Sequence, residues 1–304
     1  MENIKNEFGV NEHITPKNDI VFKKIFGSKG NEKILQDFLE SILDIKIGSL
    51  ILDLSTELLP EFYNRKQSRV DVRTILLDGT EVNIEMQIDI SKYSDQRCLQ
   101  HWSKLYSNSL KSGKSYKKLH KTICIWILDG NVFEGFSDFH SKWEIANLKH
   151  GISNRFNELE FHMIELNKFR NDDIMKKSKK KFWLWFIDHS NGEMLKMAYV
   201  SNERIREARE QLDKIRSDPA LMERIRLEEA YEWDVETAKE QAKIDGHAEG
   251  RAEGKAEGIT EGIEKQKKET AIKMIKKEMK AELISELTEL SIEEIEKIKL
   301  EINK

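Results

Sequence analysis

The sequence is poor in cysteine and lacks long apolar runs, and both absences exclude classes of protein. Its 304 residues contain two cysteines, Cys98 and Cys124, without paired spacing, so a disulfide framework or a zinc site is not expected. The longest apolar segments are 122–128 and 182–187. They are far shorter than the roughly 18 residues of a membrane-spanning helix, and their length suits buried strands. We therefore expect no membrane partner.

Targeting and nucleotide-binding signatures are missing as well. Residues 1–5 carry charge and no apolar stretch of the signal-peptide kind, which, together with the scarcity of cysteine, predicts a cytoplasmic protein. The sequence has no Walker loop, dinucleotide fingerprint or nucleophile elbow. Its histidines do not have the spacing of metal ligands.

The net charge of −4 at first argues against a nucleic-acid partner. The charge is unevenly distributed, however, because the excess of acids lies in residues 201–304 and residues 1–200 have a small excess of bases. A mildly basic first part of the chain permits DNA binding without requiring it.

A β-hairpin is predicted between residues 69 and 89, and its alternation brings polar groups to one face. Asp78-Gly79 predicts a tight type I′ turn, because this turn needs positive φ values that glycine tolerates best. On the second strand, Glu85 and Gln87 point to the same side, about 7 Å apart along the strand. The residues expected on that face are Asn83, Glu85, Gln87 and Asp89, with Val82, Ile84, Met86 and Ile88 on the other.

Asp71, on the first strand of this hairpin, can face Glu85 and Gln87. Two carboxylates on one sheet face repel each other unless a positive group lies between them. Oxygen ligands of this kind suit Mg²⁺ or Mn²⁺. The hairpin therefore predicts a divalent-metal site.

The remaining pattern predicts a mixed α/β core. Expected helices span 16–26, which begins at Thr15-Pro16 and ends before Gly27, then 31–43 and 95–112. Expected strands span 45–54 and 121–128, with further strands within 136–166. The order is helix, strand, hairpin, helix, strand.

These motifs together resemble the PD-(D/E)XK nuclease superfamily, and within it the bacterial Rpn group of recombination-promoting nucleases, also called PD-(D/E)XK nuclease family transposases. The resemblance covers about residues 14–300. Besides the hairpin, it rests on the segments 19–27, 97–106, 113–116 and 122–128 and on the glycine-rich repeat after Asp245.

The resemblance implies a restriction-endonuclease-like αβββαβ core with a mixed central sheet, followed by a long helical C-terminal extension. It implies a Mg²⁺-dependent DNA endonuclease, with Mn²⁺ as a possible substitute, that acts in DNA recombination or mobile elements. Asp71 and Glu85 would bind the metal, Gln87 would position water, and Asp19 would be a supporting acid. The residues that could contact phosphate or DNA are Arg97, Lys66 and Tyr106.

One departure from the superfamily pattern concerns Gln87, which occupies the usual lysine position. Glutamine can orient water but brings no charge, so Lys66, Lys23 or a second metal would have to supply the cation. The alternative function is therefore a weak or inactive nuclease fold that binds DNA or forms oligomers.

Each candidate residue also has an ordinary structural explanation. Asp71 could pair with a neighbouring arginine, Glu85 could be a solvent-facing strand acid, and Asp19 could stabilise the first turn of its helix. Arg97 could form an ion pair with Asp95 or Asp89.

The C-terminal third changes character. We expect a nuclease-like domain over 14–200, a charged helical connector over 201–245, a repeat over 246–264 and a small helical unit over 265–304. In the repeat, glycines recur every four residues at 246, 250, 254, 258 and 262. The repeat is either a flexible tether or a helix that self-associates, and the C-terminal helices predict a homo-oligomer. Ser291 and Glu294 form a predicted capping box.

Overall fold

A computed structural model gives the fold of the chain. The ranges that it describes are 13–53, 72–88, 93–110, 115–153, 155–173, 176–189 and 191–302. The chain divides into two compact units, Met1–Ile225 and Arg226–Lys304. In the described residues, no helix is both long and apolar enough to span a membrane.

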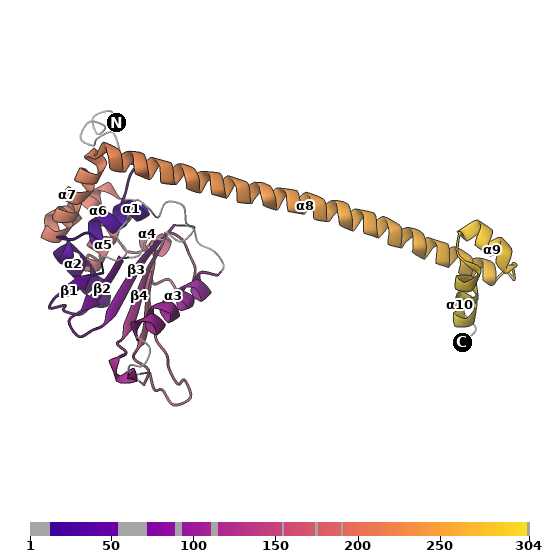
Figure 1. The fold of residues 1–304 in the computed structure, drawn as a ribbon, viewed down its shortest axis with the longest axis horizontal. Helices are drawn as coiled ribbons and strands as arrows, with labels where there is room; N and C mark the ends of the chain where they lie inside the picture. The colour runs from indigo at the N-terminus through magenta and orange to yellow at the C-terminus, as the bar shows by residue number, and fades with distance from the viewer. Residues whose placement is uncertain are drawn as a thin grey trace. The chain divides into compact units, whose positions relative to one another are not determined.

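The first unit is built on a six-stranded mixed sheet with the strand order β1-β2-β3-β4-β6-β5. Figure 1 shows β1 to β4 of this sheet side by side. The strands are β1 (Leu50–Leu52), β2 (Val72–Leu76), β3 (Glu81–Gln87), β4 (Thr122–Leu128), β5 (His140–Trp143) and β6 (Leu159–Glu165). β1, β2 and β3 pair antiparallel, β3, β4 and β6 pair parallel, and β5 pairs antiparallel with β6.

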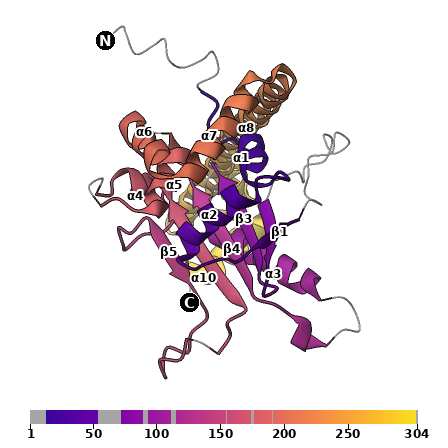
Figure 2. The same cartoon turned by 90° about the vertical axis from the view of Figure 1, so that its left-hand side faces the viewer.

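Helices cover both faces of this sheet (Figures 1 and 2). The helices of the first unit are α1 (Asp19–Phe26), α2 (Glu32–Leu43), α3 (Ser94–Ser109), α4 (Leu166–Arg170), α5 (Lys179–Asp188), α6 (Gly192–Ser201) and α7 (Glu203–Ser217). The order α2, β1, β2, β3, α3, β4 confirms the predicted αβββαβ core.

The two faces have separate cores. On one face, Ile84 of β3 and Ile125 of β4 pack with residues of α1, α2 and α5 in the larger core. On the other face, Trp126 of β4 and Phe161 of β6 pack with Cys98 of α3 in a smaller core. The predicted alternation is therefore confirmed within β3, from Val82 to Gln87, and its polar face lies under α3. Ile88 follows the end of β3 and is exposed, and Asp89 lies outside the described residues.

The hairpin between β2 and β3 forms as predicted, but its turn differs. Gly79 has φ +87° and Asp78 does not have positive φ, whereas a type I′ turn needs positive φ at both central residues. Leu76 N–H bonds to Thr80 C=O, and Gly79 N–H bonds to Leu76 C=O, both at 2.9 Å. The loop therefore has three residues and ends in a left-handed glycine. A Cβ at Gly79 would also lie 2.4 Å from His120 Nδ1.

Two other sequence-based expectations are corrected. The first helix begins at Asp19 and not at Pro16, because Asn18 Oδ1 caps it by accepting the N–H groups of Ile20 and Val21. The apolar segment 182–187 is part of the helix α5 and not a strand. A short, continuously buried run has no periodicity that separates a strand from a helix. Here the Ser178 hydroxyl accepts the Lys181 N–H and begins the helix.

The described residues of the second unit form helices joined by short turns. α8 (Pro219–Ile275) begins in the first unit, and α9 (Ala281–Thr288) and α10 (Ile292–Ile302) follow it. Ser291 and Glu294 form the predicted capping box, with Ser291 N–H to Glu294 Oε2 at 2.8 Å and Glu294 N–H to Ser291 Oγ at 3.2 Å. Ile284 and Ile295 form a small core with Ala271.

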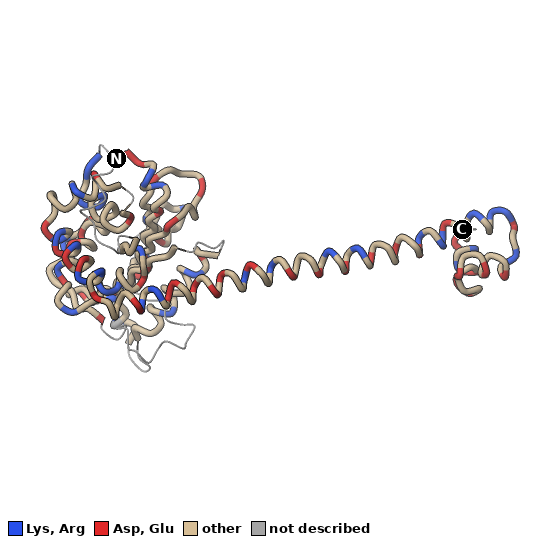
Figure 3. The backbone as a smooth tube through the Cα atoms, turned by 90° about the horizontal axis from the view of Figure 1, so that it is seen from above, with Lys and Arg blue, Asp and Glu red and all other residues tan. Residues whose placement is uncertain are grey.

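The glycine repeat lies inside α8 and is helical. Acidic and basic residues alternate along this helix (Figure 3). Residues 246–262 are all exposed. The domain boundaries given above for the C-terminal third stay a prediction.

Candidate functional site

Glu85 lies on the sheet face that α3 covers. Its partner in the parallel pairing of β3 and β4 is Trp126, which belongs to the smaller core with Cys98 of α3. Only 3% of Glu85 is exposed. The structural alternative of a solvent-facing strand acid is therefore wrong, and the burial of this carboxylate needs another reason.

Among the described residues, the side chains of His101 and Asn83 form hydrogen bonds with the Glu85 carboxylate. His101 Nδ1 makes a short hydrogen bond to Oε1, and Asn83 Nδ2 donates to the same oxygen at 3.4 Å. Within the described ranges, Oε2 has no hydrogen-bond partner, and no lysine or arginine pairs with this carboxylate. A buried carboxylate is costly without counter-charge, so this arrangement favours a bound cation.

Cys98 responds to the same negative charge. Burial raises the pKa of its thiol, and the nearby Cys124 and Glu85 raise it further. The thiol therefore stays protonated at neutral pH and does not act as a nucleophile.

Gln87 is the last residue of β3 and faces the same side as Glu85, two residues away. It is 8% exposed, and its carbonyl accepts the Asp129 N–H at 3.0 Å beyond the end of β4. The structure therefore places the predicted amide beside the predicted acid, at the C-terminal end of the strand.

Arg97 lies in the first half of α3 and turns toward the sheet. Its Cζ is 5.6 Å from the ring centroid of Trp126, the β4 residue that pairs with Glu85. Its Nη2 atom is buried and has no hydrogen-bond partner in the described part of the chain. An unsatisfied buried guanidinium N–H is costly, and a phosphate oxygen would satisfy it.

Tyr106 has a different environment. Its ring stacks on Trp102 at a centroid distance of 4.9 Å, and Trp102 Nε1 donates to the Thr122 carbonyl at 3.0 Å. Burial and the charge of Glu158 raise the pKa of the Tyr106 hydroxyl. Tyr106 therefore belongs to the packing between α3 and β4, and its predicted contact with DNA remains a prediction.

The other predicted residues are distributed as follows. Asp71 and Lys66 lie outside the described residues. β2 is described from Val72, which pairs with Ile84, the residue before Glu85. Asp19 is half-buried at the start of α1, and Lys23 of the same helix is 7% exposed. The role of Asp19 as a supporting acid stays a prediction.

The donor set fits a hard divalent cation in its chemistry. Asn83 Oδ1 is buried and has no partner in the described ranges, and Glu85 and Gln87 add a carboxylate and an amide. Mg²⁺ and Mn²⁺ prefer such oxygen ligands. The described residues alone contain no cluster of three His, Cys, Asp or Glu side chains that could hold a metal, so Asp71 is needed to complete the predicted pair of acids.

His101 is the residue of this site that sequence reasoning missed. Its contact with Glu85 joins α3 to β3 across 16 positions of sequence. The only local signal is that Arg97 and His101 are four residues apart and so share one face of a helix. Metal-ligand spacing, the criterion applied to the histidines, does not detect this relation.

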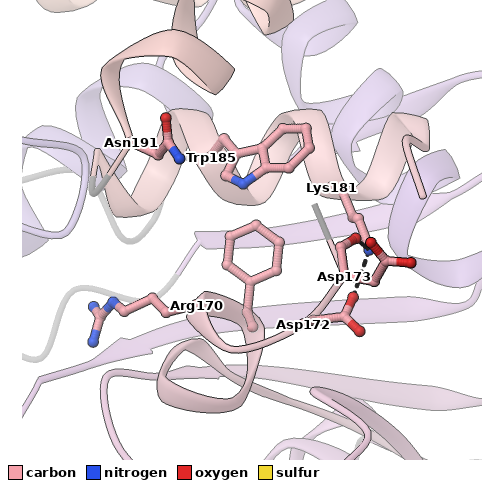
Figure 4. A pocket seen from close by; sticks show the side chains of 7 residues that line it. Arg170, Asp172, Asp173, Lys181, Trp185 and Asn191 are labelled. Atoms are coloured by element: carbon pink, nitrogen blue, oxygen red, sulfur yellow. Dashed lines mark hydrogen bonds and ion pairs between the residues drawn. The ribbon is translucent and has the colours of Figure 1, made fainter. Parts of the chain in front are cut away.

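A separate cavity of about 260 Å³ lies between α4 and α5 (Figure 4). Its lining residues are Phe169, Arg170, Asp172, Asp173, Lys181, Trp185 and Asn191, and none of them belongs to β3 or α3. Lys181 Nζ is bound to Asp172 Oδ2 at 2.5 Å and to the Asp173 carbonyl at 2.6 Å (Figure 4). This ammonium group is therefore already engaged, and the cavity is separate from the Glu85 carboxylate.

Comparison with known proteins agrees with this fold. No curated protein and no solved structure matches the chain. The sequence model of the family described as PD-(D/E)XK nuclease family transposase matches residues 16–242. This match covers the whole sheet, α3 and Glu85, and well over half of the 304 residues. The chain therefore belongs to the PD-(D/E)XK nuclease family transposases.

Proposed function

We propose that this protein is a Mg²⁺-dependent DNA endonuclease that acts in DNA recombination or on mobile elements. The observation that supports it most is Glu85, a carboxylate that is 3% exposed and has no lysine or arginine partner in the described ranges, in a chain of a nuclease family. Buried carboxylates are normally paired with cations. Because the chain belongs to a nuclease family, we infer that this cation is a divalent metal.

In this proposal, Asp71 and Glu85 hold the metal, which when bound lowers the pKa of a water molecule and polarises the scissile phosphate. The side-chain amide oxygen of Gln87 accepts a hydrogen bond from the attacking water and so orients it. Arg97 donates its unpaired Nη2 group to a phosphate oxygen. Gln87 cannot supply the positive charge of the usual lysine. This charge comes from Lys66, from Lys23 or from a second metal.

The test is plasmid nicking by the purified full-length chain in Mg²⁺ or Mn²⁺. Glu85→Gln and Asp71→Asn should abolish nicking, because each removes a charged ligand. Glu81→Gln is the matched control, since Glu81 lies on the same strand and is half-buried, and it should nick like the parent.

Equal nicking by parent and Glu85→Gln would contradict the proposal. Absence of nicking in the parent, combined with retained DNA binding, would favour the second candidate function, a DNA-binding module without catalysis. The uncharged Gln87 at the lysine position is the observation that favours this second candidate.

We also propose that the second unit mediates self-association. Leu283 and Leu287 of α9 are 43% and 56% exposed and lie outside its small core. They are four residues apart and so form an apolar strip on one helix face. Leu283→Glu with Leu287→Glu should reduce the particle mass measured by light scattering without affecting nicking of DNA. An unchanged mass would contradict this proposal.

A further inference from the structure

His101 is held in a defined position between two residues of the sheet. Its Nδ1 atom contacts Glu85 Oε1, and its ring lies edge-on to Trp126 with centroids 5.6 Å apart and an interplanar angle of 68°. Since Trp126 is the cross-strand neighbour of Glu85, the imidazole is fixed from two directions at the candidate acid. The side chain of His101 is 25% exposed, against 4% for Glu85.

The direction of the hydrogen bond follows from the partner. An ionised carboxylate only accepts hydrogen bonds, so Nδ1 of His101 carries the proton and donates it to Oε1. Asn83 donates to the same oxygen at 3.4 Å. Both donors found in the described ranges therefore engage Oε1, and in these ranges Oε2 is left for another ligand.

We propose that His101 is a positioning residue for the metal of the proposed function, on which this inference rests. By donating to Oε1, it fixes the rotamer of Glu85 and presents Oε2 to the ion. A ligand that is already oriented loses less conformational freedom on binding, and side chains that orient metal ligands typically contribute a factor of about 10–100 to metal affinity. His101 acts through Glu85 and does not itself contact substrate.

The test compares two substitutions that differ in one hydrogen-bond donor. His101→Leu fills much of the space without a donor, and His101→Asn places an amide N–H near the position of Nδ1. Mn²⁺ binding to the full-length chain is measured by calorimetry, and the Mn²⁺ concentration for half-maximal nicking is measured in parallel. Gln100→Leu, at an exposed neighbouring position of α3, controls for substitution in this helix.

We expect His101→Leu to raise the dissociation constant for Mn²⁺ about 10–100-fold, His101→Asn to recover most of this loss, and Gln100→Leu to bind like the parent. A purely structural role would make the leucine and asparagine variants equally defective, which would overturn the proposal. Unchanged Mn²⁺ affinity in His101→Leu would also overturn it.

The two proposals can fail separately. If the parent binds Mn²⁺ and nicks DNA while His101→Leu does the same with equal affinity, only the positioning role fails. If the parent neither binds Mn²⁺ nor nicks, both fail. If the His101→Leu variant does not fold, His101→Gln is used in its place. The amide of glutamine reaches the position of the histidine Nε2 atom and not that of Nδ1. The proposal then expects weaker Mn²⁺ binding for glutamine than for asparagine.

Discussion

Two buried glutamates on opposite faces of the same sheet each bond to a histidine, yet their surroundings differ. Glu160 of β6 is 5% exposed and bonds to His162 Nε2 at 2.7 Å, to Lys121 Nζ at 2.6 Å and to Lys142 Nζ at 3.1 Å. Glu85 of β3 is similarly buried, and its hydrogen-bond partners among the described residues are His101 and Asn83.

The difference separates a structural carboxylate from an available one. The hydrogen bonds from His162, Lys121 and Lys142 and the charge of Lys121 outweigh burial and hold the pKa of Glu160 well below its usual range. Glu160 could bind a metal only by losing lysine partners. In the described ranges, Glu85 has no lysine partner to lose. A buried glutamate that bonds to a histidine is therefore a candidate metal site only where no lysine or arginine pairs with it.

The largest effect that would sharpen this comparison is on metal binding. Mn²⁺ should raise the melting temperature of the parent and of Glu160→Gln, because a ligand that binds the folded state stabilises it by mass action. The same ion should leave Glu85→Gln unaffected, and nicking should fall roughly a hundredfold or more in that variant, since metal coordination supplies several kcal/mol. A thermal shift that survives in Glu85→Gln would break the comparison.

The next effect is on the free energy of unfolding, and here Glu160 and not Glu85 should show the larger change. Glu160→Gln should lower the free energy of unfolding by about 2 kcal/mol, because it removes the carboxylate that Lys121 pairs with and one of the two that Lys142 pairs with. This is less than for a fully buried pair, since the side chains of Lys121 and Lys142 are 35% and 48% exposed. Glu85→Gln should stay within about 1 kcal/mol of the parent, as it removes a charge that lacks such partners. Urea denaturation of both variants measures the two values, and equal losses would contradict the distinction.

A smaller effect concerns pH. Because the folded-state pKa of Glu160 is depressed, its contribution to stability is complete above the unfolded pKa of about 4.3 and is lost as pH falls toward the folded value. The stability difference between the parent and Glu160→Gln should therefore be constant from pH 7 to about 5.5 and shrink below about pH 4.5. If the stability difference between the parent and Glu160→Gln grew as the pH fell, the expected direction of this pH dependence would be wrong.

The smallest effect is expected for Lys142→Ala. Lys142 is half-exposed and also pairs with Glu144 at 2.9 Å, so removing it should cost less than about 1 kcal/mol while Lys121 continues to neutralise Glu160. A loss as large as that of Glu160→Gln would mean that Lys142 and not Lys121 dominates the pairing.

The sequence predicted what depends on short-range pattern. The shared face of Glu85 and Gln87 follows from the period of two along a strand, and the capping box at Ser291 follows from a four-residue motif. The turn at Asp78-Gly79 was placed correctly but given the wrong type, because glycine alone does not determine how many residues the loop contains.

What the sequence did not predict depends on contacts across the fold. The segment 182–187 was expected as a strand because a buried run of six residues has no distinguishing period. The partner of Glu85 was not foreseen, since His101 reaches it only after α3 has packed on the sheet. The same packing encloses Glu85, which the strand pattern alone left exposed.

The four-residue repeat in α8 has a consequence for the effect of salt. Glu249, Glu253, Glu257 and Glu261 are four residues apart, as are Arg251 and Lys255, so neighbours along one helix face carry the same charge. Such i,i+4 neighbours repel, whereas most surface helices gain from pairs of opposite charge. Added salt weakens exposed electrostatic interactions of either sign. Amide hydrogen exchange in residues 246–262 should therefore slow as ionic strength rises, the reverse of the behaviour of a helix held by ion pairs.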